Sequence, residues 1–82
     1  MWEKKYQQAS AVFTQAVDSY PDYAEAYVGR AYSNSVLDVK GDAVIADFRN
    51  AEEAYRRRGQ PDRANNIAKL IKQYQREKLG IQ

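Results

Sequence analysis

The sequence matches itself when it is shifted by 35 residues, and this internal repeat constrains the fold more than any other feature. The shift superposes like residues: Ala11 on Ala46, Phe13 on Phe48, Ala16 on Ala51 and Tyr20 on Tyr55. A second correspondence, shifted by 40, places 21–24 (Pro-Asp-Tyr-Ala) on 61–64 (Pro-Asp-Arg-Ala). Periods of this length are typical of helical hairpins stacked on copies of themselves, because one hairpin cannot bury its own apolar face. We therefore expect an all-α fold in which Phe13 and Phe48 are deeply buried at equivalent places.

Apolar residues at helical spacing predict four helices, at about 3–19, 22–39, 42–58 and 62–78. Pro21 should end the first helix, and Gly59 with Pro61 should end the third. The second should end at Lys40-Gly41, because glycine turns left-handed without strain. The joints are short, which favours antiparallel packing of consecutive helices.

Three aspartates are placed to cap the later helices. Asp22, Asp42 and Asp62 each stand at an expected helix start, where a side-chain oxygen can accept a hydrogen bond from an exposed backbone N–H. Glu25 follows Asp22 by three residues and would complete a capping box.

The composition argues against catalysis. The 82 residues include no Cys and no His, which excludes thiol chemistry, imidazole catalysis and the usual zinc ligands. A carboxylate pair such as Asp42 and Asp47 is conceivable, but residues five apart on a helix point in different directions. We expect no enzyme activity, no cofactor and no metal site. No apolar run approaches the roughly 20 residues of a membrane helix. Absence of Cys fits a reducing compartment, so we expect a cytoplasmic protein without membrane contact.

The net charge of +2 conceals a gradient along the chain. Residues 1–48 carry four basic and seven acidic side chains, and residues 49–82 carry nine basic and four acidic ones. The halves can attract each other within or between molecules, or the basic half can bind an acidic partner. The run Arg56-Arg57-Arg58 raises the alternative of a nucleic-acid or acidic-lipid site. We favour a solvated face, because cations are stabilised at a helix C-terminus in any case.

Three segments together resemble the tetratricopeptide repeat family. Residues 6–21, with Tyr6, Ala9, Phe13, Ala16 and Pro21, resemble the second helix of such a repeat and its closing proline. Residues 22–31 (Asp-Tyr-Ala-Glu-Ala-Tyr, then Arg-Ala) resemble the opening of the next first helix, and 41–51 resemble a second helix again. The sequence departs from the family pattern at Asn34, where an aromatic is usual, at Val44, where a small alanine is usual, and in an extra turn at 56–60.

The resemblance implies a right-handed α-solenoid fragment formed by a single domain over 1–82. In it, 3–19 would be the second helix of a partial repeat, 22–58 one repeat, and 61–79 a C-terminal capping helix. The first helix of the first repeat would then be missing, which leaves one side of 3–19 exposed.

Ligands of this family bind mainly on the concave face formed by the first helices. Carried onto this sequence, that face holds the candidate binding residues Glu25, Val28, Gly29, Tyr32, Ser35 and Val36. Tyr32 is the expected hot spot, and Gly29 would let a ligand approach the backbone closely. The alternative is that an absent helix or a second copy covers this stripe.

We therefore expect a non-catalytic protein-interaction or scaffold module that binds a protein or peptide. The alternative is a structural homo-oligomer, such as a homodimer, whose helices complete one another. A nucleic-acid or acidic-lipid binder acting through the basic half is favoured least.

Overall fold

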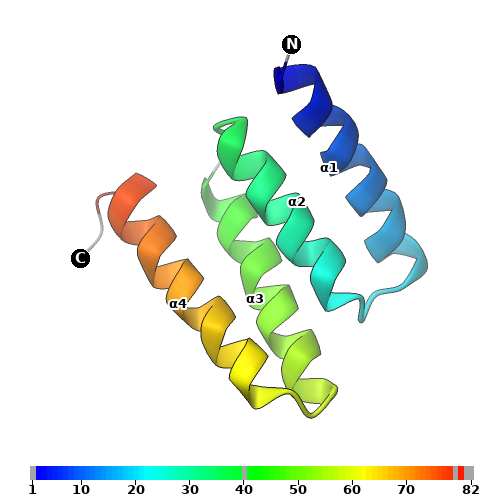
Figure 1. The fold of residues 1–82 in the computed structure, drawn as a ribbon, viewed down its shortest axis with the longest axis vertical. Helices are drawn as coiled ribbons and strands as arrows, with labels where there is room; N and C mark the ends of the chain where they lie inside the picture. The colour runs from blue at the N-terminus through cyan, green and yellow to red at the C-terminus, as the bar shows by residue number, and fades with distance from the viewer. Residues whose placement is uncertain (1, 40, 79, 81–82) are drawn as a thin grey trace.

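The computed structural model of the chain describes residues 2–39, 41–78 and 80. These residues form α1 (Trp2–Ser19), α2 (Ala24–Val36), α3 (Gly41–Arg57) and α4 (Pro61–Lys78), with no strand among them. The helices lie side by side in chain order and alternate in direction, as Figure 1 shows. In the described part of the chain, each helix contacts only those adjacent to it in sequence. The result is a slab with extents of 38 × 35 × 16 Å. The four helices, with no strand in the described part of the chain, confirm the expected all-α fold.

The main core lies between α2, α3 and α4, with α3 in the middle. Five alanines of these helices have no exposed surface: Ala24, Ala31, Ala51, Ala54 and Ala64. Such small side chains allow neighbouring helices to approach closely. The larger residues Val44, Phe48, Tyr55, Ile67 and Ile71 fill the remaining space. Phe48 is only 7% exposed, as predicted.

The burial predicted for Phe13 is wrong, because α1 has one neighbour where α3 has two. Phe13 is half-buried, and Val17 is the one residue of α1 classed as buried. The contrast is larger about two turns further on, since Tyr20 is 68% exposed and its counterpart Tyr55 only 5%. The two helices share a residue pattern, but only α3 is packed on both sides.

The predicted capping box at the start of α2 is also wrong. The helix begins at Ala24, and Tyr23 occupies the N-cap position without a side-chain cap hydrogen bond. Asp22 lies outside the helix, where its Oδ1 accepts hydrogen bonds from Nε and Nη2 of Arg57, at 3.0 and 2.6 Å. An ionised guanidinium is a stronger donor than a backbone amide. The Arg57 guanidinium therefore holds the Asp22 carboxylate at the C-terminal end of α3.

The remaining helix ends also differ from the prediction. α2 stops at Val36, and the residue with a left-handed backbone is Asp38, with a φ of 57°. Aspartate tolerates this conformation better than most residues. Gly41 instead begins α3, and Lys40 lies outside the described residues.

The predicted caps Asp42 and Asp62 lie within the first turns of their helices rather than before them. α4 begins at Pro61, which suits a first helical position because its missing N–H would have no partner there. Gly59, with a φ of 71°, forms the left-handed turn before it.

Candidate partner-binding surface

The six predicted binding residues lie on α2 but differ in exposure. Val28 is half-buried and packs against the main core. Ser35 and Val36 are half-buried. Glu25 is exposed and accepts a hydrogen bond from Nη1 of Arg58 at 2.8 Å. Only Tyr32 combines a large apolar surface with high exposure, at 59%. The predicted binding face therefore has one well-exposed aromatic side chain, Tyr32, flanked by residues that are half-buried or paired.

Gly29 does not leave room for a ligand, so that expectation is wrong. A Cβ added at Gly29 would lie 2.6 Å from both Cε atoms of the Phe13 ring. Atoms at that separation overlap, so any larger residue would displace the ring. The missing side chain instead admits Phe13, and this contact fixes how α1 lies against α2.

Tyr32 is part of a row of aromatic side chains that crosses from α2 to α1. The rings of Tyr32 and Tyr6 are 6.2 Å apart between centroids and are inclined at 60°. Tyr6 in turn meets Trp2 at 6.0 Å in an edge-to-face arrangement, at 75°. Both separations lie in the range of favourable aromatic pairs. Trp2 is 55% exposed and Tyr6 is half-buried. We call Trp2, Tyr6 and Tyr32 the aromatic row.

Sequence reasoning missed two of the three residues in this row. The spacing of four between Trp2 and Tyr6 places them on one side of a helix. Their approach to Tyr32, however, depends on the relative position of α1 and α2, which the contact between Gly29 and Phe13 helps to set.

Two concave regions flank α1 and α2 at their opposite ends. One of them is lined by Trp2, Glu3, Ser10, Asn34 and Val36, among others, and so includes Trp2 of the aromatic row but neither Tyr6 nor Tyr32. The other lies at the turn between the helices and is lined by Tyr20, Pro21, Tyr23, Glu25 and Arg58, among others. Exposed aromatic residues thus occur at both ends of this half of the molecule.

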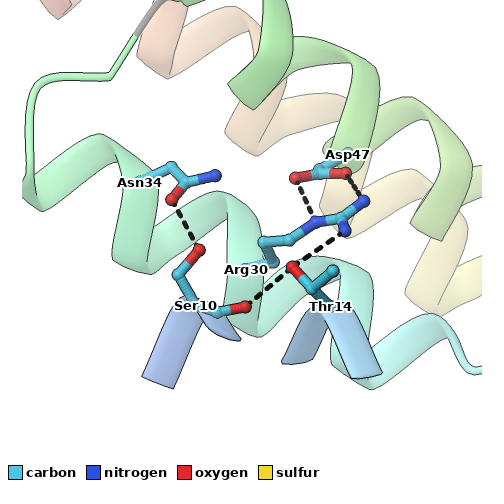
Figure 2. A network of polar contacts seen from close by, with 5 residues as sticks. All are labelled: Ser10, Thr14, Arg30, Asn34 and Asp47. Carbon is cyan, nitrogen blue, oxygen red and sulfur yellow. Dashed lines mark hydrogen bonds and ion pairs between the residues drawn. The ribbon is translucent and has the colours of Figure 1, made fainter. Parts of the chain in front are cut away.

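A polar network on the opposite side of α2 joins three helices, as Figure 2 shows. Nε and Nη2 of Arg30 on α2 donate to the two carboxylate oxygens of Asp47 on α3, at 2.9 and 2.7 Å. Nη1 of Arg30 also donates to Oγ1 of Thr14 on α1, at 3.2 Å. Ser10 on α1 donates to Oδ1 of Asn34 at 2.9 Å. This hydrogen bond uses Asn34, the residue that departs from the family pattern.

The ion pair in this network is shielded from water. The side chains of Arg30 and Asp47 are only 21% and 7% exposed. The hydrogen bond with Asp47 raises the pKa of Arg30 further above its ordinary value. Because Arg30 and Tyr32 are two residues apart, they point to nearly opposite sides of α2. The network therefore anchors one side of the helix that presents Tyr32 on the other.

The two carboxylates considered as a pair, Asp42 and Asp47, lie in different surroundings. Asp47 is buried in its ion pair with Arg30, whereas Asp42 is exposed. Over the described ranges, no three His, Cys, Asp or Glu side chains lie close enough to hold a metal ion. None of the helices described has the length and apolarity needed to cross a bilayer.

The three consecutive arginines at the end of α3 all pair with carboxylates. Arg56 binds Glu52 on its own helix at 2.9 Å. Arg57 binds Asp22 at 2.6 Å, and Arg58 binds Glu25 at 2.8 Å. Two of these pairs join the basic half of the chain to the acidic half, so the opposite charges attract within one molecule. The pairing leaves this run of arginines less available for phosphates.

Glu25 shows the electrostatic effect of these pairs. Its partial burial raises the pKa of the carboxyl, but the hydrogen bond and positive charge of Arg58 outweigh it, so the pKa of Glu25 is lowered from 4.5. The carboxylate is thus held ionised beside the turn between α1 and α2.

Comparison with known proteins adds no relative. The chain matches no protein-family model, no curated protein and no solved structure. The resemblance to tetratricopeptide repeats therefore depends on the residues of this chain alone.

Proposed function

We propose that this chain is a non-catalytic, tetratricopeptide-like module that binds a protein or peptide through the aromatic row. The observation that carries the proposal is the exposure of Trp2 and Tyr32, 55% and 59%, in one continuous row with Tyr6. Tyrosine and tryptophan are the residues most enriched at binding hot spots, because they join a large apolar area to a polar group.

The contacts that hold α2 in place favour binding of a partner by a preformed surface. Tyr32 lies on a helix that is held to α3 by the ion pair of Arg30 and Asp47 and to α1 by the packing of Phe13 on Gly29. A side chain presented by a fixed helix loses little conformational freedom when a partner docks. Ser35, Val36 and Glu25 flank Tyr32 on α2 and would supply contacts at the rim.

The expected ligand is a short segment with one apolar anchor. Trp2 also lines a concave region at its end of the row, where such an anchor would insert beside the indole ring. The tetratricopeptide-like arrangement is part of this proposal. It is supported by the 35-residue repeat, which relates α1 to α3, and by the antiparallel order of the helices.

A displayed peptide library selected on the chain tests the proposal. Peptides that bind the native chain should lose about 2 kcal/mol of binding energy, roughly thirtyfold in Kd, on Tyr32→Ala. The Tm should change by less than about 2 °C, since surface substitutions have small effects on stability. Leu70→Ala is the matched control, because Leu70 is 39% exposed on α4, far along the chain from the row.

Two results would contradict the proposal. Unchanged binding by Tyr32→Ala would show that the row is not the site. Unfolding of that variant would show that Tyr32 is a structural residue rather than a contact for a partner.

A further inference from the structure

The outer edge of α1, which faces away from α2, is an uncovered helix surface at one margin of the slab (Figure 1). Helical spacing places eight exposed residues along this edge. They are Lys4, Lys5, Gln8, Ala11, Val12, Gln15, Asp18 and Ser19. At its centre, Val12 is 61% exposed, beside Ala11.

The internal repeat relates part of this edge to a surface of α3 that α2 covers. The counterparts of Val12 and Ser19, which are Asp47 and Ala54, are buried on α3, whereas those of the other residues that the structure describes are exposed. The 35-residue shift superposes Val12 on Asp47. Asp47 is 5% exposed and binds Arg30 of α2, so this position on α3 faces a neighbouring helix. On α1 the same position carries an apolar side chain, and none of the helices that the structure describes lies beside it. Valine suits contact with another apolar surface, whereas aspartate suits a cation.

The opposite margin of the slab does not complement this edge. The outward residues of α4 are polar or charged and exposed: Asn66, Lys69, Gln73, Arg76 and Glu77. The large apolar side chain exposed on α4, Leu70 at 39%, lies to one side of them. A polar outer helix is the usual way in which a helical array ends. Head-to-tail stacking of α1 on α4 would therefore bury Val12 against charged groups. A closed, two-fold arrangement, in which the same edge meets itself, avoids this mismatch.

We propose that a second copy of this chain docks on the outer edge of α1, with the two α1 helices antiparallel. Charge complementarity favours this occupant. With the two-fold axis between Ala11 and Val12, Lys4 of each copy lies within one residue of the level of Asp18 of the other. Lys4 and Asp18 are also only about 40° apart around the helix, so they lie on the same side of the contact line. Lys5 adds a second cation at the same end. A parallel pairing would instead place Lys4 and Lys5 of both copies together, which is repulsive.

This dimer is independent of the proposed partner site. Val12 lies about a third of a turn around α1 from Tyr6, at 100° per residue, so the aromatic row stays accessible. A pair of single helices is a small interface, and we expect a Kd of about 10–100 µM.

Sedimentation from about 10 µM to 1 mM tests the association, since this range brackets the expected Kd. The native chain should dimerise over it, and Val12→Lys should weaken the dimer at least tenfold with unchanged circular dichroism. Asp18→Lys should weaken it several-fold, and adding Lys4→Asp should restore it. A monomer throughout the range would overturn the proposal, as would a failure of the paired charge reversal to restore dimerisation.

Cysteine cross-linking tests the orientation, because the chain contains no Cys of its own. Gln8 and Gln15 lie at the same level in the antiparallel pair, whereas two copies of Gln8 lie about 10 Å apart along the axis, at 1.5 Å per residue. A mixture of Gln8→Cys and Gln15→Cys should therefore give mainly the mixed disulfide in a glutathione buffer. Lys69→Cys on α4 is the control and should stay unlinked. Preferred same-residue disulfides, or equal linking of the control, would overturn the arrangement.

Discussion

Replacing Gly29 by alanine tests how α1 is held to α2. In the middle of a helix, alanine is more favourable than glycine by about 1 kcal/mol. The new Cβ would lie 2.6 Å from both Cε atoms of Phe13, so the ring must move. Overpacking of this kind costs about 1–3 kcal/mol. The two effects oppose each other, and we expect a net loss of about 1 kcal/mol, or about 4–8 °C in Tm for a domain of this size.

A double-mutant cycle separates the two effects. Phe13→Ala removes the ring and, because the ring is half-buried, should cost about 2 kcal/mol, less than for a fully buried phenylalanine. A chain of 82 residues has about 4–12 kcal/mol of stability, so this variant should still fold. In that background, Gly29→Ala should stabilise by about 1 kcal/mol, since only the gain in helix propensity remains.

Urea unfolding followed by circular dichroism measures all four chains under one set of conditions. The coupling between the two positions should be about 1–3 kcal/mol, which is well above the error of the method. The reasoning is refuted if Gly29→Ala changes stability with the same sign and size in both backgrounds. That result would mean that the ring does not occupy the space beside the glycine.

Three further predictions concern the core and the ion pairs. Phe48→Ala should cost about 3–5 kcal/mol in urea unfolding, and a Tm shift of only a degree or two would contradict its place in the core. Asp47→Ala leaves the Arg30 guanidinium shielded from water and without its carboxylate, and should lower the free energy of unfolding by about 2–4 kcal/mol. Adding Arg30→Leu to the same chain should recover part of this loss, and no recovery would argue against a direct pair. The pKa of Glu25 is lower in the folded state than in the unfolded state, where it is near 4.5. Its pairing with Arg58 therefore stabilises the fold above that unfolded pKa, and this stabilisation is lost as the pH falls through the folded-state pKa. Glu25→Gln should therefore lower the Tm at pH 7 but not at pH 3, and an equal change at both would exclude the linkage.

The sequence predicted the helices well because their signals are local. Apolar residues at helical spacing located all four helices, and Phe48 was correctly placed in the core. The helix ends were predicted less well. Asp22 could bind the amides of its own helix or a distant guanidinium, and only the folded chain brings Arg57 within reach.

The candidate site was predicted only in part, for a related reason. The pattern that includes Phe13 is the same as the pattern that includes Phe48, but the exposure of each depends on how many helices surround it. A glycine in a sequence does not show which side chain lies against it. The contact of Tyr6 with Tyr32 and the pairing of Arg30 with Asp47 join residues on different helices, 26 and 17 positions apart, so no local pattern indicates them.

The order of the helices in the slab has a consequence for folding. Since each described helix contacts only its neighbours in sequence, the chain forms its contacts by closing short loops, which costs little entropy. Folding in microseconds to milliseconds is typical of such a topology. The same order allows α1 to open while the core around α3 remains intact. In hydrogen exchange, the amides of α1 would therefore report a smaller opening free energy than those of α3. The exposed surface of α1 would thus be the first part of the fold to open and the last to form on refolding.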